Sequence, residues 1–174
     1  MKHLILGSFF VLICTFFTSV SASSTVSHVG SYYESSSDVE AYGVDVLINS
    51  NSSTAAVYIG VNINNVTATQ AIADDEKSDT QTAFVFAGVK LNLPISPYLE
   101  LGKDLGDSLI NDIIPADVNV MDNYITVGLT TSQKFPVGAS VYYKYYTFRY
   151  SDKNDDHQSN SFGATGIRLF FRFR

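Results

Sequence analysis

Cysteine is nearly absent from this chain of 174 residues, because its only cysteine, Cys14, lies in an apolar segment close to the amino terminus. Disulfide bonds therefore cannot stabilise the rest of the chain, and thiolate metal sites and thiol nucleophiles are excluded there as well. Small secreted domains of animals commonly rely on a disulfide framework. Among exported proteins, the lack of one favours a bacterial envelope protein.

Basic residues and long apolar runs are also scarce. The chain has 11 lysines and arginines against 17 aspartates and glutamates, which gives a formal net charge of −6. This balance argues against a nucleic-acid partner, since binding phosphates requires a basic surface. Outside the amino-terminal segment, no stretch approaches a run of about 18 apolar residues, the length that indicates a transmembrane helix. A helical membrane protein is therefore excluded.

Residues 1–22 have the pattern of a secretory signal peptide. Lys2 is followed by an apolar run from Leu4 to Phe17, and Val20-Ser21-Ala22 is a small-residue cleavage site. The run is shorter than the roughly 20 apolar residues of a spanning helix, which disfavours an uncleaved anchor. We expect cleavage after Ala22 and one exported domain over residues 23–174, long enough to bury a core of its own.

Side chains alternate between apolar and polar with a period of two over much of residues 23–174, which is the pattern of β-strands. From Ala55 to Ile63, for example, every second side chain is apolar, while the other face carries small, polar and tyrosine residues. Eight segments are predicted as strands, so the fold class is all-β. They are Thr25–Tyr33, Glu40–Ile48, Thr54–Asn64, Thr82–Leu93, Pro97–Lys103, Asn123–Gln133, Ala139–Tyr150 and Phe162–Phe173.

The connections between these strands alternate in length and character. The tight ones are Asn49–Ser53, Pro94–Ser96 and Lys134–Gly138, the long acidic ones are Asn65–Gln81, Asp104–Asp122 and Ser151–Ser161, and the first, Glu34–Val39, is short but polar. Short periplasmic turns alternating with longer extracellular loops are typical of outer-membrane barrels. A Greek-key sandwich does not sort its loops in this way. The alternation predicts an eight-stranded antiparallel up-and-down transmembrane β-barrel.

Five charged residues fall on the polar faces of five different predicted strands. Side chains just fill the interior of an eight-stranded barrel, so these charges are expected to face one another inside it. A buried charge without a partner is costly, which requires carboxylates and cations to form a network. The predicted network consists of Asp45, Lys90, Glu100, Lys144 and Arg168.

The carboxy-terminal strand has one apolar and one cationic face. Together with the signal peptide, the loop pattern and the segment Leu93–Gly102, this strand resembles the small eight-stranded bacterial outer-membrane barrels, and the length and layout are similar to the YfaZ-like family. The resemblance implies that the apolar face is the signal read by the outer-membrane assembly machinery. That face consists of Ile167, Leu169, Phe171 and Phe173. Such strands usually end in an aromatic residue, so Arg174 departs from the pattern by one residue.

Residues with catalytic or metal-binding chemistry are few. His28 and His157 are the only histidines after residue 22, and the aspartates and serines near His157 are ordinary loop residues. Two acidic clusters offer oxygen ligands, but no spacing matches a calcium-binding loop. They are Asp74, Asp75, Glu76 and Asp79, and Asp152, Asp155 and Asp156. We interpret them as solvated loops and expect no catalytic residue, no metal site and no cofactor.

These observations predict an outer-membrane barrel with a filled lumen, acidic extracellular loops and a structural or surface-binding role. Its expected partners are outer-membrane lipid, lipopolysaccharide and the assembly machinery, and we expect a monomer. Two alternatives remain open. One is a barrel enzyme that acts on lipid or peptide, with His157 at its rim. The other is a soluble periplasmic lipocalin-like binder, which would need an apolar interior and a polar outer surface.

Overall fold

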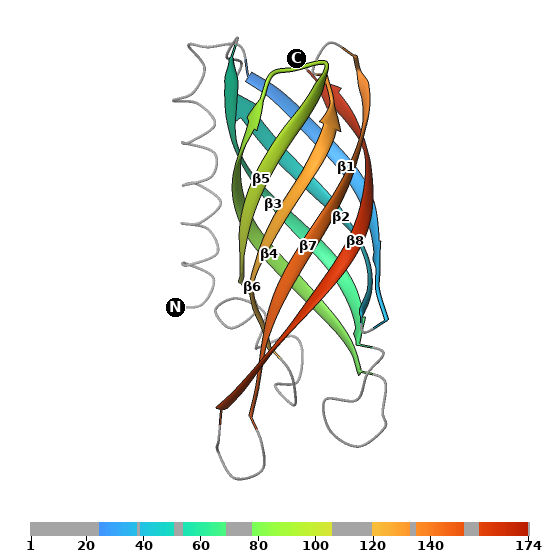
Figure 1. Ribbon diagram of the computed structural model, residues 1–174, viewed down its shortest axis with the longest axis vertical. Coiled ribbons are helices and arrows are strands. Elements are labelled where there is room, and N and C mark those ends of the chain that lie inside the picture. Colours follow the sequence, from blue (N-terminus) through green and yellow to red (C-terminus); the bar gives the residue numbers. More distant parts are fainter. Residues whose placement is uncertain are drawn as a thin grey trace, which may run out of the picture.

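The computed structural model describes residues 25–37, 39–50, 54–68, 78–105, 120–132, 135–151 and 157–173. In this part of the chain, eight strands form a closed antiparallel barrel in which each strand pairs with the next and β8 pairs with β1 (Figure 1). The predicted all-β, up-and-down barrel fold is therefore confirmed. The strands are β1 (Thr25–Ser35), β2 (Val39–Ser50), β3 (Ala55–Ala68), β4 (Ser78–Leu91), β5 (Ile95–Asp104), β6 (Val120–Thr131), β7 (Val137–Ser151) and β8 (His157–Phe173). No helix in these ranges is long and apolar enough to span a membrane.

The two ends of the barrel differ in the lengths of their connections. We call the end with connections 51–54, 92–94 and 132–136 the short-turn end, and the opposite end the long-loop end. The short-turn end is uppermost in Figure 1 and also contains the end of β8. At the long-loop end, 69–77 and 105–119 are the longest connections.

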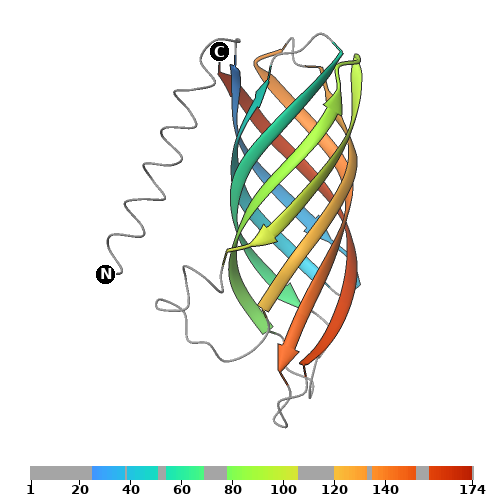
Figure 2. The same ribbon diagram turned by 90° about the vertical axis from the view of Figure 1, so that its left-hand side faces the viewer.

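The last hairpin is longer than the sequence predicts. β7 and β8 pair as far as Ser151 and His157, and both strands reach beyond the others at the long-loop end (Figures 1 and 2). The connection is therefore 152–156, so the prediction of a long loop over Ser151–Ser161 is wrong. The physical reason is that the residues of this extension are polar on both faces. Apolar alternation cannot reveal a strand of that kind, whereas a continuous antiparallel ladder can still form.

Successive side chains on each strand point alternately to the outside and the inside of the barrel. The outward face of every strand is apolar over its central part. When one apolar residue is taken from each strand, the exposed fractions range from 41% for Val89 to 59% for Leu169. The other representatives are Val29, Val46, Ile59, Leu101, Val127 and Val141. The inward face holds tyrosine, phenylalanine, small polar residues and charged residues, nearly all of them buried. The apolar and charged surfaces are thus inverted relative to a water-soluble protein.

Aromatic rings fill the interior where the neighbouring strand carries glycine. A Cβ at Gly102 would overlap the ring of Tyr124, and a Cβ at Gly166 would overlap the ring of Tyr142. The rings of Tyr58 and Phe170 lie against Gly88 and Gly138 in the same way. Because a barrel of eight strands is narrow, large rings fit inside only beside residues without a side chain. The lumen is consequently filled with side chains.

Candidate functional site

The centre of the barrel interior holds an arginine between two carboxylates. Arg168 on β8 lies with its Nε 2.8 Å from Oδ2 of Asp45 on β2. Its Nη1 and Nη2 each lie 3.4 Å from an oxygen of Glu100 on β5. All three side chains are buried. The structure thus brings together three of the five residues that were predicted to form an interior network, and they come from three separate strands.

A second charged cluster lies on the long-loop side of the interior. Nζ of Lys144 is 2.6 Å from Oε1 of Glu34, and the hydroxyl of Tyr142 donates a hydrogen bond of 2.7 Å to the same oxygen. The hydroxyl of Tyr146 donates to the other oxygen, Oε2. The ammonium group also stands 4.3 Å from the ring centroid of Tyr124, close enough for a cation–π interaction. The carboxylate is therefore satisfied by one cation and two hydroxyl groups.

Sequence reasoning missed Glu34, because it placed this residue at the start of the first outer loop. That placement is wrong, since β1 continues to Ser35 and the side chain of Glu34 is completely buried. The available signal was the alternation within β1, in which His28, Gly30 and Tyr32 also face inward. Continuing that alternation by one step would have placed Glu34 inside the barrel.

Tyrosine hydroxyls and rings link the two clusters. The hydroxyl of Tyr124 donates a hydrogen bond of 2.9 Å to Glu100 and accepts one of 3.2 Å from the amide of Asn62. The same ring faces the ammonium group of Lys144. The ring of Tyr142, whose hydroxyl binds the second cluster, has its centroid 5.5 Å from Cζ of Arg168. The polar interior is therefore one connected network from the centre to the long-loop side.

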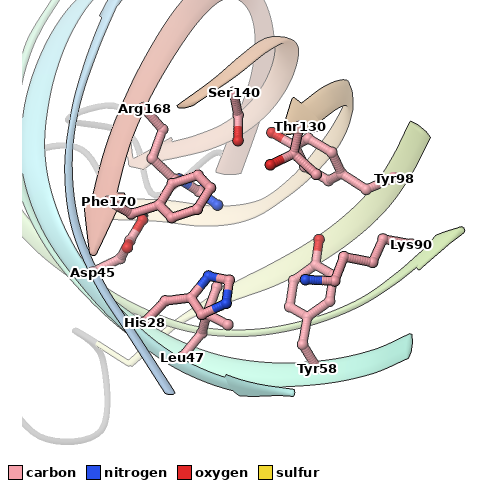
Figure 3. A pocket seen from close by; sticks show the side chains of 10 residues that line it. All are labelled: His28, Asp45, Leu47, Tyr58, Lys90, Tyr98, Thr130, Ser140, Arg168 and Phe170. Atoms are coloured by element: carbon pink, nitrogen blue, oxygen red, sulfur yellow. The ribbon is translucent and has the colours of Figure 1, made fainter. Parts of the chain in front are cut away.

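Lys90 stands apart from this network, although the sequence placed it there. It is the last inward-facing residue of β4 before the short-turn end, and only 4% of its surface is exposed. Among the described residues, its ammonium group makes no hydrogen bond and no ion pair. It borders a cavity of about 20 Å³ between the central cluster and the short-turn end (Figure 3).

His28 borders the same cavity and is engaged with its neighbours. Its Nε2 lies 3.0 Å from the amide nitrogen of Asn49, and its ring stacks on Phe170 with 5.0 Å between the centroids. The other candidate, His157, pairs with Ser151 on the ladder between β7 and β8, and its side chain lies outside the described part. Within the described ranges, no group of three or more His, Cys, Asp or Glu residues is arranged to hold a metal ion.

Arg172 lies inside the barrel near the short-turn end and binds the turn between β6 and β7. Its guanidinium group donates hydrogen bonds of 2.7 to 2.9 Å to the carbonyl oxygens of Ser132, Phe135 and Thr131. These carbonyls belong to the end of β6 and the connection that follows it. Arg172 is 7% exposed, and these hydrogen bonds hold the turn between β6 and β7 in place. Arg174, the residues of the predicted signal peptide and the acidic residues at 74–76, 152, 155 and 156 lie outside the described residues. Asp79, the remaining member of the first acidic cluster, belongs to β4.

The apolar residues of the last strand point away from this interior. Ile167, Leu169, Phe171 and Phe173 are all more than half exposed on the outer surface. On the same strand, Arg168, Phe170 and Arg172 face inward and are buried. The strand therefore places its apolar side chains on the outer wall and its arginines in the lumen.

No protein family and no curated protein matches the chain in sequence. The class of protein is therefore defined by its fold and interior: a closed eight-stranded β-barrel with an apolar wall and a lumen filled with aromatic and charged side chains.

Proposed function

We propose that this protein is an outer-membrane β-barrel of a Gram-negative bacterium, exported by a signal peptide over residues 1–22, with a structural or surface-binding role. The observation that carries the proposal is the apolar outer wall of the barrel. Side chains such as Val57, Ile95 and Val141 are exposed by 65%, 65% and 55%, and such residues recur on all eight strands. A continuous apolar belt of this kind is unfavourable in water and favourable in lipid.

The charged residues in the barrel interior also support this proposal. A soluble lipocalin-like binder would need an apolar cavity for its ligand and a polar outer surface. In this barrel the buried residues include Glu100, Lys144 and Arg168, while the outer wall is apolar. This distribution favours a lipid environment over the soluble alternative.

Aromatic residues flank the apolar belt, as they do at the two interfaces of membrane barrels. Near the short-turn end the outward aromatic residues are Phe135, Phe171 and Phe173. On the side of the long loops they are Tyr33 and Tyr42, whereas Tyr143 and Tyr145 pair with Val127 and Ile125 within the belt. We infer that the belt between them faces lipid tails and that lipopolysaccharide surrounds the tyrosine side. Ile167, Leu169, Phe171 and Phe173 would then serve in addition as the signal for the assembly machinery.

The filled lumen supports a structural or surface-binding role rather than bulk transport. The connected side chains of Arg168, Glu100, Tyr124 and Lys144 occupy the centre of the barrel. The enzyme alternative rests on His157, whose side chain lies outside the described part, so it stays a prediction. A closer relation to the YfaZ-like family stays a prediction from the resemblance in length and layout.

Cell fractionation combined with gel electrophoresis tests the proposal. We expect the protein in the outer-membrane fraction, soluble only in detergent, and migrating differently on a gel before and after boiling, as a closed barrel does. Mass analysis of the purified protein should give a chain that begins after Ala22. A protein that stays soluble without detergent would contradict the membrane location.

A further inference from the structure

We propose that the cavity beside Lys90 is a binding site for one small monovalent anion of the size of chloride. The inference begins with Lys90, which is 4% exposed as a residue and whose ammonium group makes no hydrogen bond or ion pair among the described residues. Figure 3 shows the side chain pointing into the cavity. An ammonium group in such a place requires a counter-charge or a polar ligand.

The surrounding groups are mainly hydrogen-bond donors. The hydroxyl of Tyr98 is buried and has no hydrogen-bond partner in the described part of the chain. Hydroxyl groups of Thr130 and Ser140 border the same cavity. The hydroxyl of Tyr58 also lines it and donates a long hydrogen bond of 3.5 Å to the carbonyl of Leu99. Hydroxyl and ammonium groups that converge on one small volume suit an anion.

The charge balance of the interior points in the same direction. Among the buried residues described, the cations are Lys90, Lys144, Arg168 and Arg172, and the carboxylates are Glu34, Asp45 and Glu100. The charges of these side chains therefore sum to one positive charge. Lys144 and Arg168 pair with carboxylates, whereas Arg172 is bound by carbonyl oxygens, which carry no formal charge. A single bound anion would neutralise the interior.

Asp45 is the one carboxylate that lines the cavity, and its position decides where the anion lies. Its Oδ2 is paired with Arg168 at 2.8 Å, so part of its charge is already balanced. In Figure 3, Asp45 and Lys90 stand on opposite sides of the cavity. The anion therefore binds on the side of Lys90 and Tyr98, away from the carboxylate.

The size of the cavity limits the ligand. A volume of about 20 Å³ exceeds the roughly 10–15 Å³ that one water molecule needs, so it accommodates a single small ion or one or two waters. Phosphate esters and organic carboxylates are too large. Lys90 and Thr130 are the last inward-facing residues of β4 and β6 before the short-turn end, so the cavity lies near that end of the barrel.

Thermal unfolding of the purified full chain tests the proposal. Circular dichroism would be recorded in sodium chloride and in sodium gluconate at equal ionic strength and pH, because gluconate cannot enter the cavity. We expect a higher Tm in chloride, since a ligand that binds only the folded state stabilises it. This dependence should be lost in Lys90→Met and kept in Lys103→Met, which removes an exposed lysine from β5. A chloride effect that persists in Lys90→Met would overturn the assignment.

A second measurement does not depend on the folding of the variant. The ³⁵Cl NMR line of a chloride solution should broaden with the folded wild-type protein, and added bromide should reverse the broadening by competition. Equal Tm values in the two salts, together with no broadening beyond that caused by the unfolded chain, would mean that only water occupies the cavity, and the proposal would be wrong. The site does not depend on the membrane location, because the cavity is a property of the closed barrel.

Discussion

Arg168 and Asp45 form an ion pair across the strand that separates them. Their own strands, β8 and β2, both pair with β1, and the distance from Nε to Oδ2 is 2.8 Å. The pair passes beside Gly30 of β1, which is opposite Asp45 on one side and Phe170 on the other. A Cβ at Gly30 would lie 2.8 Å from Oδ1 of Asp45 and 3.0 Å from Cβ of Phe170. Glycine at this position therefore leaves room for the ion pair.

Removing the arginine should destabilise the barrel strongly. The substitution Arg168→Met leaves Asp45 and Glu100 buried without a cation, and breaking a buried pair in this way costs about 3–5 kcal/mol. The free energy of unfolding, measured by urea titration of the folded band on a gel, should fall by that order. Neutralising the two carboxylates in the same variant, by Asp45→Asn and Glu100→Gln, should recover much of the loss. A single variant as stable as the wild type would contradict the ion-pair account.

Filling the space at Gly30 should also destabilise the fold, by a different mechanism. In Gly30→Val the new side chain collides with Asp45 and Phe170, and overpacking of this kind costs about 1–3 kcal/mol. The control is Ser31→Val, which places the same side chain on the next residue of the strand, where it points outward. Urea midpoints of the two variants would be compared. Equal midpoints would show that the close approach at Gly30 is unimportant.

How much of this could be predicted from the sequence depended on the contrast between the two faces of each strand. In β3 and β6 the outward side chains are apolar and the inward ones small, polar or tyrosine, so alternation was enough to predict the strands. In β1 and at the far ends of β7 and β8, both faces contain polar residues. In β1 this weak contrast led the strand to be ended at Tyr33, although continuing its inward positions by one step leads to Glu34.

The pairing of the interior charges could not be predicted from sequence for a geometric reason. Lys144 on β7 binds Glu34 on β1, and β8 lies between those strands. Such a contact depends on the stagger of the strands and on the reach of each side chain across the lumen, neither of which alternation encodes. For the same reason, the sequence could not separate Lys90 from the network that contains Arg168.

The pair of Lys144 and Glu34 should show a large coupling energy. Both side chains are completely buried and their charged atoms lie 2.6 Å apart, so each substitution alone leaves the other charge without a partner. In a double-mutant cycle of Lys144→Met and Glu34→Gln, the double variant should be more stable than the sum of the single losses by about 0.5–3 kcal/mol. Urea titration supplies the four free energies. A sum of single losses that equals the loss of the double variant would mean that the two charges do not interact.

A charge on the outer wall should separate a lipid environment from water. Val127 lies on β6 between Ile125 and Leu129, in the middle of the apolar belt, and is 51% exposed. In a bilayer Val127→Arg should cost about 2–4 kcal/mol, whereas arginine near the interface costs only about 0–1 kcal/mol. Leu93→Arg is the matched control, since Leu93 is also half exposed, at 50%, but lies in the turn between β4 and β5. Folding into lipid vesicles, measured by urea titration, should therefore be impaired far more by the first substitution. Equal effects of the two arginines would indicate that the belt does not face lipid, because in water both positions tolerate a charge.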